Sequence, residues 1–301
     1  MPKELSSEFP HVLNVVSADA GELAGPLRAA VAAQGAAGEI AWLSPSRAFD
    51  IPFAGDPVLA REAARMVARN VAADINALAS TNRRKKLLVA DMDSTIIGCE
   101  CLDELADAAG LKPKIAAITE RAMRGEILFE PALRERVALL KGLPVSALEE
   151  TYRRAVRLNP GAKALVATMK RHGARALLVS GGFTFFTSRV AREAGFDAER
   201  ANVLLDDGAR LTGKVREPIL GREAKLEALK GAIAELHIGA DDALAVGDGA
   251  NDLAMIQYAG LGVAYHAKPI VAEAAGASID HGDLRGLLYL QGYKDEEIVE
   301  K

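Results

Sequence analysis

Hydrophobic residues in the second part of the chain come in short continuous runs, and helical stretches separate these runs. Three of the runs are followed directly by Asp, Ser or Gly: 87–90, 176–179 and 243–246. A further run, 260–264, also has the composition of a strand. Continuous apolar strands that alternate with helices are typical of a parallel sheet covered on both faces. Such sheets bind ligands at the carboxyl ends of their strands, where the polar residues of this chain lie.

A long segment between the first two of these strands has helical periodicity instead of strand patterning. Its expected helices are 101–109, 112–124, 130–140 and 145–158. The segment is too long for a plain connection between neighbouring strands. We therefore expect a helical cap, inserted at about residues 100–172, that lies over the strand ends.

The first 80 residues have a different pattern. Strands are expected at 11–18, 38–44 and 48–53, and helices at 21–33 and from Asp56 to about Leu78. Asp56 is a favourable N-cap, and a proline suits the first position of a helix. This order indicates a small α+β domain at 1–80, ahead of a catalytic domain at 81–301. The basic stretch 80–86 between them is interpreted as a solvated linker.

Composition excludes several classes of protein. The 301 residues carry a net charge of −4, whereas a surface that follows nucleic-acid phosphates is usually basic, so no nucleic-acid partner is expected. No apolar run approaches the ~18 residues of a membrane helix, and the first residues have no apolar signal region, so no membrane partner is expected. The two cysteines, Cys99 and Cys101, are too close for an unstrained disulfide. Reduced thiols indicate a cytoplasmic protein.

Three polar clusters follow the predicted strands: Asp91-Met-Asp93, Ser180-Gly181-Gly182 and Gly247-Asp-Gly-Ala-Asn-Asp252. Each of them alone could be an ordinary turn. Together they place carboxylates from two strand ends beside a hydroxyl group and glycine N–H groups. Carboxylates suit a hard cation such as Mg²⁺, and the hydroxyl and N–H groups suit phosphate oxygens. Lys225 lies 23 residues before Asp248 and could neutralise an anion, although a lone helix lysine is usually solvated.

Other catalytic signatures are missing from the sequence. It contains no P-loop and no Gly-x-Ser-x-Gly elbow, and its five histidines have no metal-ligand spacing.

The three polar clusters and Lys225, in their order and spacing, resemble the four motifs of the haloacid dehalogenase superfamily. Within that superfamily they resemble the phosphoserine phosphatases. The resemblance covers roughly residues 86–290. It implies an α/β fold with a Rossmann-like parallel sheet and an inserted helical cap. It also implies a Mg²⁺-dependent phosphomonoesterase.

The resemblance assigns a role to each motif residue. Asp91 would be the nucleophile that forms an aspartyl phosphate, and Asp93 would be the general acid and base. Mg²⁺ would be held by the Asp91 carboxylate, the Asp93 backbone carbonyl and Asp248. The phosphoryl oxygens would be held by Ser180, Gly181 and Lys225, with Gly182 in support. Asn251 would lie at the substrate, and Asn251 and Asp252 would orient Lys225 or metal-bound water.

The cap carries the features that suggest the substrate. Glu100 follows Asp91 by nine residues, and segment 123–136 resembles the cap motif of phosphoserine phosphatases. By this resemblance Glu100 would pair with a substrate ammonium, Arg136 with a carboxylate, and Met123 and Phe129 would form an apolar wall. Without the resemblance, these residues would be ordinary surface residues of cap helices.

The implied reaction is hydrolysis of O-phospho-L-serine to L-serine and phosphate, the last step of serine biosynthesis. Two alternatives remain open at this point. The chain could be a phosphatase or phosphotransferase for another small phosphomonoester, or a catalytically silent sensor of an amino acid or of phosphate. The order of elements in residues 1–80 loosely resembles an ACT-like regulatory module. Amino-acid sensing, dimerisation into a homodimer, and neither of these are all compatible with that module.

Overall fold

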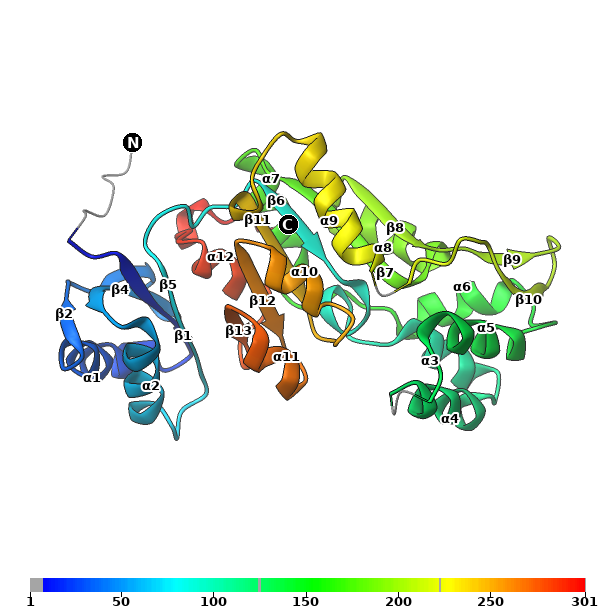
Figure 1. Cartoon of the computed structure of the whole chain (residues 1–301), viewed down its shortest axis with the longest axis horizontal. Coiled ribbons are helices and arrows are strands. Elements are labelled where there is room, and N and C mark those ends of the chain that lie inside the picture. Colours follow the sequence, from blue (N-terminus) through cyan, green and yellow to red (C-terminus); the bar gives the residue numbers. More distant parts are fainter. Residues whose placement is uncertain (1–7, 124–125, 222, 301) are drawn as a thin grey trace.

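The computed structural model describes residues 8–123, 126–221 and 223–300, except for the side chain of Met123. Three parts follow one another along the molecule (Figure 1). An antiparallel sheet with two helices lies at one end, a parallel sheet flanked by helices lies in the middle, and a group of helices lies at the other end. The predicted fold class, an α/β parallel sheet with an inserted helical cap behind a small α+β unit, is confirmed. Within the described residues, no helix combines the length and the apolar composition needed to cross a membrane.

The antiparallel sheet has one face under helices and the other against the parallel-sheet unit. Its strands are β1 (His11–Ser17), β2 (Gly35–Ala37), β3 (Ala41–Ser44), β4 (Ala48–Gly55) and β5 (Ala73–Ala79). Helices α1 (Ala20–Ala32) and α2 (Pro57–Val67) cover one face, which buries Leu13 and Val15 of β1. Successive side chains of a strand point to opposite faces. Asn14 therefore points the other way, where its amide donates to the Tyr289 carbonyl at 3.0 Å.

The end of this unit corrects the sequence analysis. The predicted helix from Asp56 to about Leu78 is confirmed in its first half, with Asp56 as N-cap, but its second half is wrong, because α2 ends at Val67 and residues 73–79 form β5. Ile75 faces the helices, whereas Asp74 and Asn76 are buried against the parallel-sheet unit. This alternation has the period of a strand, but both polar residues are bound by partners some 200 positions away in sequence.

The parallel sheet has six strands in the order β13-β12-β11-β6-β7-β8. They are β6 (Leu87–Ala90), β7 (Arg175–Phe183), β8 (Ala198–Asn202), β11 (Ala243–Gly247), β12 (Leu261–Tyr265) and β13 (Ala277–Ile279). Its helices are α7 (Ala162–Arg171), α8 (Thr184–Ala194), α9 (Ala224–Glu235), α10 (Leu253–Tyr258), α11 (Pro269–Ala274) and α12 (Gly286–Leu290). Leu88 and Ala90 pack into one apolar cluster, and Leu87 and Val89 pack into a second one. Burial on both faces explains the continuous apolar runs.

The inserted helices lie between β6 and β7, as the sequence predicts. They are α3 (Cys101–Ala108), α4 (Lys112–Met123), α5 (Phe129–Leu139) and α6 (Ser146–Ala155). A hairpin of β9 (Leu204–Asp206) and β10 (Leu211–Val215) extends from the parallel-sheet unit and packs against α5 (Figure 1). The Leu211 N–H donates to the Leu143 carbonyl at 2.8 Å, and the Gly142 N–H donates to the Leu211 carbonyl at 2.8 Å. The hairpin therefore braces the cap.

The stretch 80–86 is only in part the solvated linker that was expected, because most of its residues are exposed but the side chains of Arg83 and Lys85 are buried. Arg83 forms a buried ion pair of 2.5 Å with Asp50, and it also donates to the Leu290 carbonyl at 2.9 Å. Lys85 is buried too, and its ammonium donates to the carbonyls of Asn82 and Asp241 at 2.6 and 2.7 Å. Buried carbonyl and carboxylate groups are normally hydrogen-bonded. Arg83 and Lys85 donate to such groups and thereby connect the two sheet units.

Two buried side chains of β5 join the antiparallel sheet to β13. The Asn76 amide donates to the Ser278 carbonyl at 2.9 Å and accepts from the Ser278 N–H at 2.9 Å. The side chain thus pairs with the edge strand as a neighbouring backbone would. Asp74 accepts three N–H groups in a row, those of Asp280, His281 and Gly282, at 2.7, 3.0 and 2.8 Å. Burial raises the Asp74 pKa, and these hydrogen bonds oppose the rise.

Replacing Asn76 by alanine should lower the free energy of unfolding by about 2–3 kcal/mol, because it leaves the buried N–H and C=O of Ser278 without partners. Denaturant unfolding, followed by circular dichroism, measures the change. Exposed Asn70 provides the control, since Asn70→Ala removes no hydrogen bond to the parallel-sheet unit and should change stability by less than about 0.5 kcal/mol. Equal stabilities for the two variants would contradict the role given to Asn76.

Candidate active site at the carboxyl edge of the parallel sheet

Asp91 directly follows β6, near the middle of the parallel sheet, and is buried. Its N–H donates to the Val246 carbonyl of β11 at 3.0 Å, which extends the pairing of the two strands by one residue. Its Oδ1 accepts from the Met92 N–H at 2.8 Å. Strands β7 and β11 flank β6, so the polar segments that follow these three strands meet at one edge.

Lys225 lies in the first turn of α9 and places its ammonium between two buried carboxylates. Its Nζ is 2.7 Å from Asp91 Oδ1 and 2.5 Å from Asp252 Oδ1, and the residue is 4 % exposed. Burial opposes the charge of this ammonium, but the Asp252 and Asp91 carboxylates outweigh that effect and raise its pKa. The expectation of a solvated helix lysine therefore does not apply to Lys225.

Three carboxylates form an acidic cluster at this edge: Asp91, Asp248 and Asp252, with one oxygen of each within 4.8 Å of the others. With the Lys225 ammonium they leave two negative charges, which a divalent cation would balance. Burial raises the pKa of Asp91, and Asp252 adds to the rise while Lys225 opposes it. Burial and Asp252 likewise raise the pKa of Asp248 to about 6. A cluster of oxygen ligands with this excess charge fits Mg²⁺.

The three carboxylates do not have equal freedom to bind a cation. Both oxygens of Asp252 are engaged, Oδ1 by Lys225 and Oδ2 by the Gly249 N–H at 3.1 Å. Asp248 uses Oδ1 to accept from the Thr95 hydroxyl at 3.2 Å, and its other oxygen has no hydrogen bond within the described residues. The geometry therefore favours Asp91 and Asp248 as cation ligands. It favours Asp252 as the residue that orients Lys225.

Asp93, in the segment after β6, is hydrogen-bonded to the start of α3 and to the last part of β7. Its Oδ1 accepts from the Cys101 N–H at 2.9 Å, and its Oδ2 accepts from the Ser180 hydroxyl at 3.1 Å. Burial and the nearby Glu100 carboxylate raise the Asp93 pKa to about 6. A carboxyl group with such a pKa can both release and take up a proton near neutral pH.

The segment Ser180-Gly181-Gly182 ends β7 close to Asp93. The Gly182 N–H donates to the Ser180 hydroxyl oxygen at 2.8 Å. A Cβ atom at Gly182 would lie 3.0 Å from both Asp93 Oδ2 and Ser180 Oγ, so a larger residue here would have to displace these two side chains. The arrangement offers a hydroxyl group and small residues for contact with an anion.

Asn202 is a positioning residue that the sequence analysis missed. It is buried at the end of β8, donates to the Gly181 carbonyl at 3.0 Å and accepts from the Leu220 N–H at 2.8 Å. It thus ties the Ser180–Gly182 segment to the chain that leads into α9 and Lys225. The only signal in the sequence was an amide residue after Ala201, which does not reveal partners 18 and 21 positions away.

The predicted cap residues differ in how they interact with the residues at the edge of the sheet. The Phe129 ring is 3.4 Å from where a Cβ of Gly181 would be, so the cap touches the Ser180–Gly182 segment. Glu100 accepts from the Ser94 hydroxyl at 2.7 Å, and its charge raises the pKa of both Asp93 and Asp248. Burial lowers the Arg136 pKa, while the charges of Asp103 and Glu100 oppose the change.

Two further predicted residues complete the comparison with the sequence. The side chain of Asn251 lies against the backbone at Gly249, because a Cβ there would be 2.4 Å from its Oδ1. The side chain of Met123 lies outside the described residues, so its predicted place in the apolar wall stays a prediction.

The chain is similar to proteins of known family and activity. The pattern of the haloacid dehalogenase-like hydrolase family matches residues 88–257, which include every residue of the acidic cluster. A phosphoserine phosphatase from a Polaromonas species is 53% identical over 210 residues, which cover 68% of this chain and 89% of that protein.

Two solved structures are also similar. A probable phosphoserine phosphatase from Vibrio cholerae has a TM-score of 0.81 and 29% identity, covering 96% of this chain and 88% of its own. A phosphoserine phosphatase described as a phospho-aspartyl intermediate analogue has a TM-score of 0.63 and 39% identity, covering 68% of this chain and 98% of its own. The first similarity includes the antiparallel sheet, whereas the second covers about two thirds of the chain.

The Asp248→Asn substitution should weaken Mg²⁺ binding roughly tenfold or more, because it removes one negative charge and leaves the Thr95 hydrogen bond possible. Isothermal titration calorimetry with MgCl₂ measures the effect. The control is Asp241→Asn, at an exposed aspartate outside the acidic cluster, which should leave the affinity unchanged. Equal Mg²⁺ affinity of the Asp248→Asn variant and the unsubstituted chain would remove Asp248 from the cation site.

Proposed function

Because the chain belongs to the haloacid dehalogenase-like hydrolase family and is 53% identical to a phosphoserine phosphatase, we propose that it hydrolyses O-phospho-L-serine to L-serine and phosphate. The observation that carries this proposal is the meeting of Asp91, Asp93, Ser180 and Lys225 at one edge of the sheet. In serine biosynthesis this reaction is the last step. The free thiols Cys99 and Cys101 support a place in the reducing cytoplasm.

Asp91 acts as the nucleophile in this proposal. Its carboxylate attacks the phosphorus atom and forms an aspartyl phosphate, while the bond from phosphorus to the serine oxygen breaks. Oδ1 is held by Lys225 and the Met92 N–H, so the orientation of the carboxylate is fixed before the substrate arrives. Fixed geometry of this kind lowers the entropic part of the barrier.

Asp93 acts as the general acid and then as the general base. In its protonated form it donates to the departing serine oxygen, and as a carboxylate it then takes a proton from the water that hydrolyses the aspartyl phosphate. Its hydrogen bonds from the Cys101 N–H and the Ser180 hydroxyl hold both carboxylate oxygens, and Asp93 lies near enough to Asp91 for its charge to raise the Asp91 pKa. Its raised pKa, about 6, supports both roles.

Charge compensation comes from Lys225, Ser180 and Mg²⁺. The Lys225 ammonium and the Ser180 hydroxyl bind phosphoryl oxygens, together with the Gly181 backbone. Enzymes of this family generally use Mg²⁺, and Asp91, Asp248 and the Asp93 carbonyl would hold it. When bound, Mg²⁺ supplies positive charge that stabilises the transferred phosphoryl group.

In this proposal the cap binds the carboxylate and the ammonium of the substrate's serine part. Arg136 pairs with the carboxylate and Glu100 with the ammonium, while Phe129 and Met123 form the apolar wall. The nearness of Glu100 to Asp93 and Asp248 supports this placement, as does the contact of Phe129 with Gly181. The residues that bind and transfer the phosphoryl group would act on any phosphomonoester. The cap residues therefore determine which substrate is hydrolysed.

Asp91→Asn should lower turnover roughly a thousandfold or more, because the amide cannot attack phosphorus. Phosphate release measures the rate, and acid quenching with a ³²P-labelled substrate detects phosphorylated protein, which should form in the unsubstituted chain and in the control but not in Asp91→Asn. Asp107→Asn, at an exposed aspartate of the cap, is the matched control and should keep full activity. Turnover of the Asp91→Asn variant near that of the control would show that another residue is the nucleophile.

The substrate assignment is tested by comparing kcat/KM for phosphoserine, phosphothreonine and an aryl phosphate in the presence of Mg²⁺. Phosphoserine should be strongly preferred. Arg136→Ala should raise KM for phosphoserine by about tenfold to a hundredfold, because a charge-assisted hydrogen bond contributes about 1.5–3 kcal/mol. The aryl phosphate has no carboxylate, so its KM should change little.

The matched control for Arg136 is Arg121, a partly exposed cap arginine that pairs with Glu135 at 3.0 Å. Arg121→Ala should leave both substrates unaffected. Near-equal kcat/KM for all three phosphate esters in the unsubstituted chain would favour a general phosphatase over the serine assignment. Equal losses for both substrates in Arg136→Ala would mean that Arg136 supports the cap instead of binding the substrate.

A further inference from the structure

Two linkers connect the helical cap to the parallel-sheet unit, and they lie side by side. The first, residues 97–100, leads into α3, and the second, residues 156–161, leads from α6 to α7. Ile97 and Leu158 form an antiparallel bridge between them. Next to this bridge, the Asn159 N–H donates to the Ile96 carbonyl at 2.8 Å. Because both connections of the cap run through this pair of linkers, a change in the orientation of the cap would act on the linkers first.

The side chain of Asn159 connects the second linker to the segment that follows Asp91. Its amide N–H donates to the Thr95 carbonyl at 2.8 Å. The amide oxygen lies beside Gly98 of the first linker, where a Cβ atom would be 3.1 Å from Asn159 Oδ1. Asn159 is partly exposed, whereas Thr95 is fully buried. The linkers therefore hold the backbone of a buried residue through one hydrogen bond from a side chain.

Thr95 extends this connection to the acidic cluster. Its carbonyl is bound by Asn159, and its hydroxyl donates to Asp248 Oδ1 at 3.2 Å. Since both groups belong to one residue, a shift of the Asn159 amide would displace the hydroxyl relative to Asp248. Residues that hydrogen-bond a metal ligand fix its orientation, and their removal typically lowers metal affinity by about tenfold to a hundredfold.

We propose that Asn159 is a positioning residue of the cation site, which acts through Thr95 on Asp248 and makes Mg²⁺ affinity depend on the arrangement of the cap linkers. The inference rests on the proposed function, in which Asp248 is a ligand of Mg²⁺. The coupling is reciprocal, so bound Mg²⁺ stabilises the paired linkers by the same free energy that the paired linkers contribute to Mg²⁺ binding. An asparagine with a structural role alone would stabilise the fold and leave Mg²⁺ affinity unchanged.

Isothermal titration calorimetry with MgCl₂ on the full-length chain, without substrate, measures the effect. Asn159→Ala should weaken Mg²⁺ binding roughly tenfold. Thr95→Val, which replaces the hydroxyl by a methyl group, should weaken it to a similar extent. Thr95→Ser keeps the hydroxyl and should bind Mg²⁺ as the unsubstituted chain does. Because no substrate is present, the result does not depend on which phosphate ester the chain hydrolyses.

The double variant tests the route. If Asn159 acts through the Thr95 hydroxyl, Asn159→Ala should have little further effect on Mg²⁺ affinity in a chain that already carries Thr95→Val. Losses that multiply in the double variant would show that Asn159 acts by another route, and they would overturn the proposal. So would an unchanged Mg²⁺ affinity of Asn159→Ala, whatever the stability of that variant.

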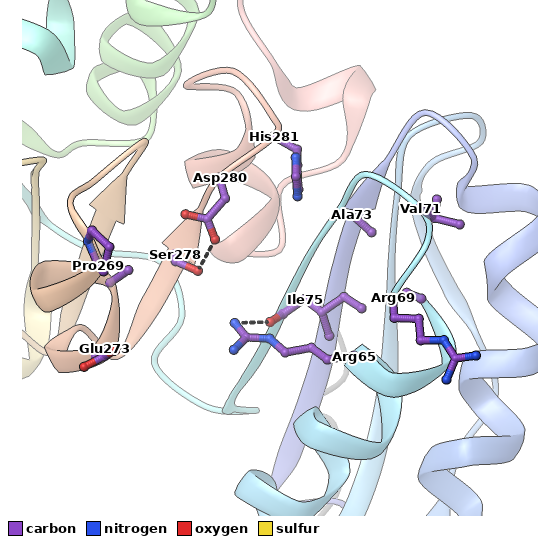
Figure 2. A pocket seen from close by; sticks show the side chains of 12 residues that line it. Arg65, Arg69, Val71, Ala73, Ile75, Pro269, Glu273, Ser278, Asp280 and His281 are labelled. Atoms are coloured by element: carbon purple, nitrogen blue, oxygen red, sulfur yellow. Dashed lines mark hydrogen bonds between the residues drawn. The ribbon is translucent and has the colours of Figure 1, made fainter.

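Ser278→Ala is the matched control for Thr95→Val. The Ser278 hydroxyl also donates to an aspartate, Asp280, at 3.0 Å, but this pair lies beside the antiparallel sheet and outside the acidic cluster (Figure 2). The control for Asn159→Ala is Asn70→Ala, at an exposed asparagine. Both control variants should bind Mg²⁺ as the unsubstituted chain does.

Hydrogen exchange of the linker backbone, followed by NMR, tests the reciprocal effect. Mg²⁺ should slow the exchange of the Asn159 N–H, which is bonded to the Ile96 carbonyl, and this effect should be lost in Thr95→Val. Exchange of this amide that Mg²⁺ leaves unchanged in the unsubstituted chain would contradict the coupling to the cap. Absence of Mg²⁺ binding to the unsubstituted chain would contradict the whole cation site, whereas equal affinities of all variants would contradict the role of Asn159 alone.

Discussion

The buried ammonium of Lys225 holds Asp91 and Asp252 close together, although the two carboxylates repel each other and burial disfavours the charge on each of them. Removing one partner of such a group leaves an uncompensated buried charge, at a cost of about 3–5 kcal/mol. The three side chains come from α9, the end of β6 and the segment after β11. Their contact therefore fixes the relative positions of three separate parts of the site.

The same charge balance explains why the site suits a cation and a phosphate ester in turn. Lys225 compensates part of the negative charge of the acidic cluster, and a divalent cation would compensate the rest. With both positive charges in place the cluster would be neutral overall, so a phosphate dianion would no longer meet a net negative charge there.

Much of the parallel-sheet unit could be predicted because its signals are local. Strand 87–90 is apolar throughout since both faces of the sheet are covered, and the polar residues directly after it reach the carboxyl edge. Strand β8 could not be recognised, because its sequence Ala-Glu-Arg-Ala-Asn lies at the edge of the sheet and is mostly polar. Lys225 could be suggested from the sequence as a partner for an anion, but only the resemblance assigned it to the site. No local pattern distinguishes it from a solvated lysine.

The errors fall where distant segments satisfy buried polar groups. Asp74 and Asn76 sit in a segment whose alanines and leucine suggested a continued helix, and their partners are backbone groups some 200 residues later. Arg83 was read as part of a solvated linker for the same reason, since nothing near it in sequence reveals the Asp50 carboxylate. Hydrogen bonds of this kind add specificity that a pattern of apolar residues does not encode.

These polar contacts give the antiparallel sheet a physical connection to the acidic cluster. Asn76 is hydrogen-bonded to β13, β13 pairs with β12, and β12 pairs with β11, which leads directly into Asp248. A second route runs through α11, because the Lys268 N–H just before it donates to the Asp248 carbonyl at 3.2 Å. Directional hydrogen bonds tolerate little sliding, unlike an apolar contact surface of the same area. A displacement of the antiparallel sheet relative to β13 would therefore have to break buried hydrogen bonds or move the strands that lead into the acidic cluster.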